Sequence, residues 1–232
     1  MPLPLSYSVR NLAARPTRSL MTASVIALVV VACSLLLGLI SSLKRTLVST
    51  GNPLNLVVMR KGSDNDGSSQ ITLEAFQAIR FLDGIARDPD DRPLASPELV
   101  VQPFFRTRDG GRENVLVRGV EPIALRVHDD VRIVEGRMLQ PSSHEVIVGK
   151  GVAGRYAGAE LGADLSFGRG TWKVVGVFES GGSSYESEVW ADVRELANDA
   201  HRIFPYSGIR IRAASAANDG SRANCGLRLS AT

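Results

Sequence analysis

The sequence predicts an α+β protein in which one N-terminal transmembrane helix precedes a mixed, largely antiparallel α/β extracytoplasmic domain. Residues 19–43 contain no charged side chain and are mostly apolar. Beyond them, short apolar runs of strand length outnumber segments with helical periodicity. Two intervening turns, residues 109–111 and 168–170, contain glycines, which accept the positive φ of tight hairpins. Because hairpins join antiparallel strands, the pattern favours a mainly antiparallel sheet.

Ser19–Leu43 has the length and composition of a transmembrane helix. About 20 residues, each rising 1.5 Å, cross the roughly 30 Å hydrocarbon layer of a bilayer. A cleaved signal peptide is one alternative, although its apolar core is usually only about 7–15 residues long. A lipoprotein is another, because residues 30–33 match a lipid-attachment box that ends at Cys33. Apolar sequence continues past Cys33, so a membrane-spanning helix explains more of the run.

The charges beside this helix predict its orientation. Three arginines and no acidic residue precede it, whereas Lys44 and Arg45 follow it. This asymmetry favours a cytoplasmic N-terminus in the cell (inner or plasma) membrane, with the main domain outside. Residues 1–18 then form a cytoplasmic lead, either an amphipathic segment at the membrane surface or a disordered one.

One side of the predicted helix carries a stripe of small residues. At 100° per residue they fall within an arc of roughly 100°. Small side chains let a second helix approach closely in lipid, where association depends on packing. Such residues are also common in any membrane helix, so both interpretations stay open. The candidate helix-packing residues are Ser19, Ala23, Ala27, Ser34, Gly38 and Ser41.

The first elements of the outer domain follow from local patterns. Leu54–Met59 predicts a buried strand, and a polar loop follows at 61–69. Thr72 is a candidate N-cap for a helix that ends near Gly84. The apolar face of that helix is expected to contain Phe76, Ile79 and Leu82.

The remaining outer domain reads mainly as strands joined by turns. Asp192 is a candidate cap for a short helix near the end of the domain. Strands are expected at Glu98–Arg108, Glu113–Val120, Val131–Leu139, Glu145–Val148, Leu165–Phe167, Trp172–Phe178, Glu188–Trp190 and Ile209–Arg212.

The composition predicts the segment boundaries. We expect a lead at 1–18, the transmembrane helix at 19–43, the extracytoplasmic domain at 44–212 and a disordered polar tail at 213–232. No further run long enough to span a bilayer follows Arg212 in the sequence.

Residues 149–154 match the GxGxxG pattern, but the sequence around them favours a turn and a short helix over a dinucleotide site. Glycines interrupt the following helix, and the next strands form a hairpin instead of a parallel crossover. No phosphate loop or nucleophile elbow is present, so we expect neither catalytic nor cofactor-binding residues. Five aspartates, Asp88, Asp90, Asp91, Asp129 and Asp130, are expected on solvated loops, and residues 181–184 as a flexible connector.

The histidine, cysteine and charge patterns argue against a metal site, a disulfide and nucleic-acid binding. The three histidines lie far apart without ligand-type spacing, so no metal site is expected. Cys33 and Cys225 are not expected to form a disulfide. The net charge of +3 is spread along the chain and aromatic residues are few, which argues against nucleic-acid binding.

An ordered series of motifs resembles the MacB/FtsX-type permeases of ABC transporters. Arg10-Asn11-Leu12 and residues 15–22 resemble the family's entry into its first membrane helix. The series Val134–Leu139 (VEGRML), Glu145–Gly149 (EVIVG), Leu161–Asp164 (LGAD) and Trp172–Phe178 (WKVVGVF) is similar to its extracytoplasmic core domain. The resemblance covers about residues 5–212, and the order of the motifs is more specific than any one of them.

The resemblance implies a non-enzymatic permease subunit that couples a separate ABC ATPase to export or mechanotransmission. It implies as partners the lipid bilayer, that ATPase, a second copy or related permease, and a periplasmic adaptor. Family members have three more membrane helices after the outer domain, so the sequence as given predicts a truncated permease. The alternative is a single-pass anchored binding or adaptor module without transport activity of its own.

Overall fold

The computed structural model describes residues 16–49 and 54–214, with side-chain surroundings for 16–42 and 54–214. These residues belong to two compact units, Met1–Thr50 and Gly51–Thr232. The predicted cytoplasmic lead lies outside the described residues, except for its last three positions, and so does nearly all of the predicted tail.

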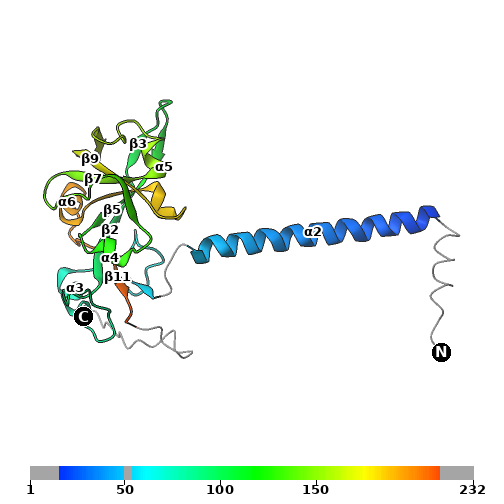
Figure 1. Cartoon of the computed structure of the whole chain (residues 1–232), viewed down its shortest axis with the longest axis horizontal. Helices are drawn as coiled ribbons and strands as arrows, with labels where there is room; N and C mark the ends of the chain where they lie inside the picture. The colour runs from blue at the N-terminus through cyan, green and yellow to red at the C-terminus, as the bar shows by residue number, and fades with distance from the viewer. Residues whose placement is uncertain (1–15, 50–53, 215–232) are drawn as a thin grey trace. The chain divides into compact units, whose positions relative to one another are not determined.

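The first unit contains the long helix α2 (Pro16–Ser49), drawn in blue in Figure 1. Proline suits the first position of a helix, where its missing N–H would have no intrahelical acceptor. Residues 16–42 are long and apolar enough to cross a membrane, and none of them is buried within the protein. In lipid, the helix satisfies its own backbone hydrogen bonds, and its apolar side chains avoid water.

The second unit is built on a nine-stranded sheet in the order β1-β11-β2-β5-β10-β7-β9-β6, with β8 paired to β9. Only the β5–β10 and β7–β9 pairs are parallel in the described sheet, which confirms the largely antiparallel prediction. The strands are β1 (Asn55–Val58), β2 (Ala95–Val101), β5 (Leu116–Val120), β6 (Arg132–Gly136), β7 (Glu145–Gly149), β8 (Asp164–Phe167), β9 (Gly170–Glu179), β10 (Glu188–Asp192) and β11 (Gly208–Arg212). A separate pair consists of β3 (Phe104–Arg106) and β4 (Arg112–Asn114).

Both faces of the sheet are covered. On β7, Val146 and Val148 belong to one core cluster, whereas Ile147 between them belongs to the other. The larger cluster includes side chains from α3 (Leu73–Ile79), α5 (Lys150–Ala153) and α6 (Val193–Asp199). The smaller includes side chains from α4 (Ala124–Val127) and the 3₁₀ turn η1 (Ser184–Ser187). Successive side chains along a central strand therefore point into two apolar layers, one on each face of the sheet.

The predicted helix caps and hairpins are confirmed. The Thr72 side chain accepts a hydrogen bond from the N–H of Ala75 at the start of α3. The Asp192 side chain accepts bonds from the N–H groups of Arg194 and Glu195 at the start of α6. β3 pairs with β4 around residues 109–111, and β8 pairs with β9 around 168–170.

Two burial predictions are wrong, and each has a physical reason. β1 is an edge strand in the described sheet, paired only with β11, so Leu56 and Val57 stay 46% and 40% exposed. The helix expected to end near Gly84 ends at Ile79, so Leu82 follows it as an exposed residue instead of joining Phe76 on the buried face.

Glycines of the GxGxxG match are explained by close packing. Gly149 caps α5, and a Cβ there would overlap the backbone carbonyl of Glu186 in η1. A Cβ at Gly151 would lie 3.0 Å from the same oxygen. The N-terminus of α5 is therefore covered by protein backbone, where a pyrophosphate would have to lie. The predicted turn and short helix are present.

Replacing Gly149 by alanine tests this packing. We expect Gly149→Ala to destabilise the outer domain by about 1–3 kcal/mol, because the new methyl group collides with rigid backbone. Gly154→Ala is the matched control, since nothing lies within 4 Å of its Cβ position and its φ is not positive. Urea unfolding followed by tryptophan fluorescence measures both changes. Equal stability of the two variants would contradict this explanation.

Candidate functional site

The predicted stripe of small residues lies on α2 within the described span. A Cβ at Gly38 would meet nothing within 4 Å, so this position is open to a neighbour. The side chains of the stripe other than Ser19 are exposed. Its role in helix packing stays a prediction for Ser19, Ala23, Ala27, Ser34, Gly38 and Ser41.

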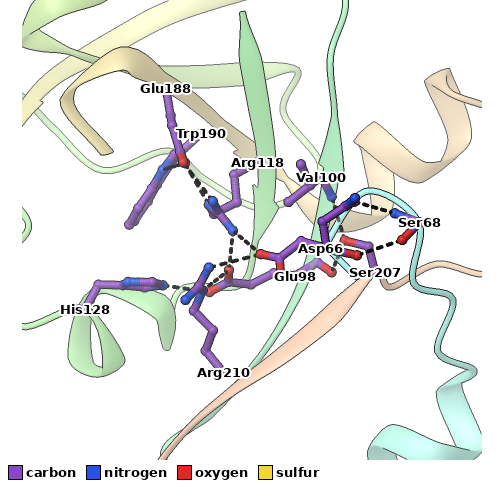
Figure 2. A network of polar contacts seen from close by, with 11 residues as sticks. Asp66, Ser68, Glu98, Val100, Arg118, His128, Glu188, Trp190, Ser207 and Arg210 are labelled. Atoms are coloured by element: carbon purple, nitrogen blue, oxygen red, sulfur yellow. Dashed lines mark hydrogen bonds and ion pairs between the residues drawn. The ribbon is translucent and has the colours of Figure 1, made fainter. Parts of the chain in front are cut away.

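The most unusual polar feature of the outer domain is a buried network of charged side chains (Figure 2). Four adjacent strands supply its centre: Arg210 from β11, Glu98 from β2, Arg118 from β5 and Glu188 from β10. Arg118 faces Trp190 in the β5–β10 register, so the network lies on the face of the smaller core.

Arg118 joins the two buried glutamates. Its Nε and Nη2 donate to the two carboxylate oxygens of Glu188, both at 2.7 Å. Its Nη1 donates to Glu98 Oε2 at 2.9 Å. The indole N–H of Trp190 adds a bond of 3.2 Å to Glu188. A planar guanidinium suits this arrangement because its donors can serve two carboxylates at once.

Glu98 has two further cationic or polar partners. Arg210 donates through Nε to Glu98 Oε2 at 2.9 Å, and His128 Nε2 lies 2.7 Å from Oε1. His128 follows α4, so this contact fixes α4 against the sheet. The ring of Tyr185 covers the group, since the guanidinium carbons of Arg118 and Arg210 lie 5.4 and 5.7 Å from its centroid.

Asp66 closes the solvent side of the network. It comes from the loop between β1 and α3, and its carboxylate is 3.1 Å from Arg210 Nη2 and 3.6 Å from Arg118 Nη1. Its side chain is 27% exposed, in contrast to the buried carboxylates beneath it. The loop that directly follows β1 is thus attached to the centre of the sheet.

The local electrostatics favour the ionised forms of Glu98 and Arg118. Burial would raise the pKa of Glu98, but the charges of His128 and Arg118 outweigh it and hold that pKa well below its ordinary value. Burial would lower the pKa of Arg118, yet Glu188 and Glu98 raise it. Each carboxylate of the network lies within 3.1 Å of an arginine nitrogen. The network is paired and has no free nucleophile, so its geometry fits a structural role.

A second buried carboxylate corrects a sequence prediction. Asp88 was expected on a solvated loop, but its side chain is only 1% exposed. It accepts bonds from the backbone N–H groups of Asp90 and Arg92 and from the side chains of Arg92 and Arg126. Asp90 and Asp91 are exposed, as expected. Asp88 therefore fastens its loop to α4.

The expected flexible connector at 181–184 is also held in place. The Glu186 carboxylate accepts bonds from the N–H groups of Ser180 and Gly182, both at 2.9 Å. Ser183 donates to Ser180, which in turn donates to Asp130. The two glycines supply the positive φ that this turn needs. The segment forms a hydrogen-bonded turn that leads into η1.

The family-like motifs also have structural explanations. Gly136 has a φ of 73°, and a Cβ there would overlap the carbonyl of Val175. Arg137 donates two bonds to Glu145, of 2.7 and 2.5 Å, and these bonds lower the pKa of Glu145 to about 2. The "GR" segment is thereby fixed to the strand that follows it.

Sequence reasoning missed the buried network, although a weak signal was available. Each of its four central residues is a charged residue in a strand with at least one apolar neighbour. Pairing them requires the strand order, because up to 112 residues separate the partners in sequence. Within the described ranges, no group of three His, Cys, Asp or Glu side chains could hold a metal ion.

Removing the central arginine tests how strongly the network is coupled. We expect Arg118→Met to lower the free energy of unfolding by about 3–5 kcal/mol, because Glu188 would remain buried without its arginine and Glu98 would lose one of its partners. Arg108→Met is the control, since Arg108 pairs with Glu160 at a half-exposed site, where loss of a pair costs about 1 kcal/mol or less. Urea unfolding followed by the emission of Trp172 and Trp190 reports the outer domain alone. A similarly small decrease in the free energy of unfolding of both variants would contradict strong coupling within the network.

The depressed pKa of Glu98 predicts acid sensitivity. The unfolded chain binds this proton near the ordinary glutamate pKa of 4.5, whereas the folded chain resists it. The Glu98 contribution is therefore complete above that pH and is lost as the pH falls below it. Unfolding between neutral pH and about pH 3 should show a shallower pH dependence in Glu98→Gln than in the parent chain. If the free energies of unfolding of the two chains change with pH in parallel, the pKa of Glu98 in the folded chain is not lowered, which would contradict this prediction.

Comparisons with known proteins agree with this fold. The crystal structure of the extracellular domain of the noncanonic ABC-type transporter YknZ from Gram-positive bacteria matches with a TM-score of 0.53 and 16% identity, covering 70% of this chain and 84% of that one. The periplasmic region of MacB from Actinobacillus actinomycetemcomitans matches with a TM-score of 0.53 and 12% identity, covering 75% and 80%. A search of curated proteins gave no match.

The family comparison covers most of the chain. The family model described as "MacB-like periplasmic core domain" matches residues 19–221. This range includes the whole predicted transmembrane segment, residues 19–43, and the whole nine-stranded sheet. The chain belongs to the MacB-like periplasmic core domain family of ABC-transporter permeases.

Proposed function

We propose that this chain is a membrane-anchored permease subunit that couples a separate ABC ATPase to export or mechanotransmission. Family membership supports this assignment, as does the description of YknZ, whose extracellular domain shares the fold, as an ABC-type transporter. In this proposal the N-terminus is cytoplasmic, the span crosses the inner or plasma membrane, and the outer domain meets a periplasmic adaptor. The chain acts as a homodimer or beside a related permease.

The observation that best supports a mechanical role is where the chain enters and leaves the sheet. β1 and β11 are neighbouring antiparallel strands, and Asn55 at the start of β1 faces Arg212 at the end of β11. The N–H of Ala213 donates to the carbonyl of Leu54 at 2.8 Å. A force arriving along the chain at Leu54 therefore acts directly on a hydrogen-bonded strand pair.

The buried network extends this connection across the sheet. Arg210 on β11 is bonded to Glu98 on β2, and Arg118 links Glu98 to Glu188 on β10. These side chains cross-link four strands that backbone hydrogen bonds already join. A displacement of β1 and β11 would be passed to β10 with little local deformation, as a force-transmitting domain requires.

Surface labelling tests the proposed topology. In a background with Cys33→Ser and Cys225→Ser, a cysteine introduced by Gln140→Cys should react with a membrane-impermeant maleimide in intact cells, because Gln140 is exposed on the outer domain. Reaction only after lysis would place the domain in the cytoplasm and refute the proposal. A cysteine introduced by Ser8→Cys in the lead should show the opposite pattern.

Co-purification tests the proposed partners. Ala27→Leu with Gly38→Leu should reduce recovery of the ATPase or second permease copy, because larger side chains prevent close helix approach. Val25→Leu is the matched control, since it adds volume on the opposite side of α2. Unchanged recovery in the double variant would remove the stripe from the interface.

A further inference from the structure

The hairpin of β3 and β4 presents an exposed face at the end of the outer domain opposite α3 (Figure 1). The strand register places Phe104 opposite Asn114 and Arg106 opposite Arg112. All four are exposed and alternate with the buried Phe105, so their side chains share one side of the hairpin. The guanidinium carbon of Arg112 lies 5.3 Å from the ring centroid of Phe104, which is 59% exposed. We call Phe104, Arg106, Arg112 and Asn114 the outer hairpin face.

Two arginines of this face lie directly opposite each other without an acidic partner. Like charges in opposite positions of a sheet repel each other. Among the described residues, no carboxylate forms an ion pair with Arg106 or Arg112. Glu113 points to the other side of β4 and pairs with Arg155 at 2.7 Å. The outer hairpin face therefore lacks negative charge and is complementary to carboxylates.

The hairpin is fixed to the domain beneath it. Phe105 on β3 belongs to the larger core cluster and is 2% exposed. The N–H of Ala157 donates to the carbonyl of Arg106 at 3.0 Å, and the hydroxyl of Tyr156 donates to Glu113 on β4 at 2.8 Å. The two arginines are therefore presented on a supported surface instead of a free loop.

The outer edge of β4 is open. At the two ends of β4, Gly111 accepts a hydrogen bond of 3.0 Å from the residue after β3, and Val115 donates one of 3.1 Å to Pro103. Because bonding positions alternate along an antiparallel pair, Arg112 and Asn114 turn their backbone N–H and C=O groups away from β3. In the ranges that the structure describes, β3 is the only strand that pairs with β4. A further strand could bond to these groups.

We propose that the outer hairpin face and the open edge of β4 bind an acidic, extended segment of a partner protein, which adds to β4 as an antiparallel strand. Its backbone would bond to Arg112 and Asn114. An acidic residue opposite Arg112 would point to the same side as both arginines, one strand spacing from Arg112 and two, about 10 Å, from Arg106. Both guanidinium groups can reach its carboxylate. This inference does not depend on the proposed coupling to an ATPase.

The chemistry of the site favours this occupant over a second copy of the chain. An open strand edge selects a polypeptide, because its N–H and C=O groups pair with another backbone. Pairing of two β4 edges would bring the Arg106 and Arg112 side chains of both copies to one interface, and the like charges would repel each other. An acidic segment removes the repulsion that the isolated hairpin contains.

Binding of a designed peptide to the full chain tests the charge requirement. The probe is a capped peptide of about ten residues in which glutamate and threonine alternate, so that all glutamates share one side of an extended strand. A control peptide has glutamine in place of glutamate. The chain is held in phosphatidylcholine nanodiscs, and the fluorescence anisotropy of a neutral label on the peptide is followed during titration. The acidic peptide should bind at least about tenfold more tightly than the neutral one.

Variants of the chain locate the site. Arg106→Gln with Arg112→Gln should weaken binding of the acidic peptide at least about tenfold. Arg132→Gln is the matched control, since it removes an exposed arginine from β6, another edge strand, and should leave the affinity unchanged. Equal binding of the acidic and neutral peptides, or unchanged affinity in the double variant, would overturn the proposal.

Methylated peptides test strand addition separately from charge. A residue opposite Arg112 directs its N–H toward β4, whereas its neighbours direct theirs away. N-methylation of the glutamates should therefore abolish binding, and N-methylation of the threonines should preserve it. Equal binding of the two methylated peptides would overturn strand addition to β4. Absence of binding by the unmodified acidic peptide would overturn the whole inference.

Discussion

The buried ion network centred on Arg118 is the interaction on which the outer domain depends. Two glutamates, on β2 and β10, are buried away from water, and the guanidinium of Arg118 between them donates hydrogen bonds to both. A buried ion pair adds little net stability compared with apolar residues of similar size, but a mispaired one is heavily penalised. The network therefore selects the strand order β11-β2-β5-β10 against alternatives that would leave a charge alone.

The same side chains connect the sheet to what surrounds it. His128 brings α4 to Glu98, and Asp66 brings the loop after β1 to Arg210. The chain enters the domain at β1 and leaves it after β11. The network thus connects these two strands to β10, which lies on the other side of β5 in the sheet. In the proposed coupling role, a movement of β1 and β11 would reach β10 through these side chains without local unfolding of the sheet.

Much of the fold could be predicted from local patterns. The caps at Thr72 and Asp192, both glycine hairpins and the apolar span depend on neighbours a few residues apart, and the ordered motifs indicated the family. Burial of Asp88 and exposure of Leu56 depend on which strand lies at an edge and where α4 packs. The network could not be predicted for the same reason. Which of Glu98, Arg118, Glu188 and Arg210 form ion pairs depends on the strand order.

Native-state hydrogen exchange on the full chain in nanodiscs tests most directly whether the network unites these strands. In Arg118→Met, we expect the amide protons of β11, β2, β5 and β10 to lose protection together and to the same extent, since the four strands open as one unit when their shared centre fails. Loss of protection confined to β5 and its immediate neighbours would show that the strands are stabilised separately, and would contradict a force path through the buried charges.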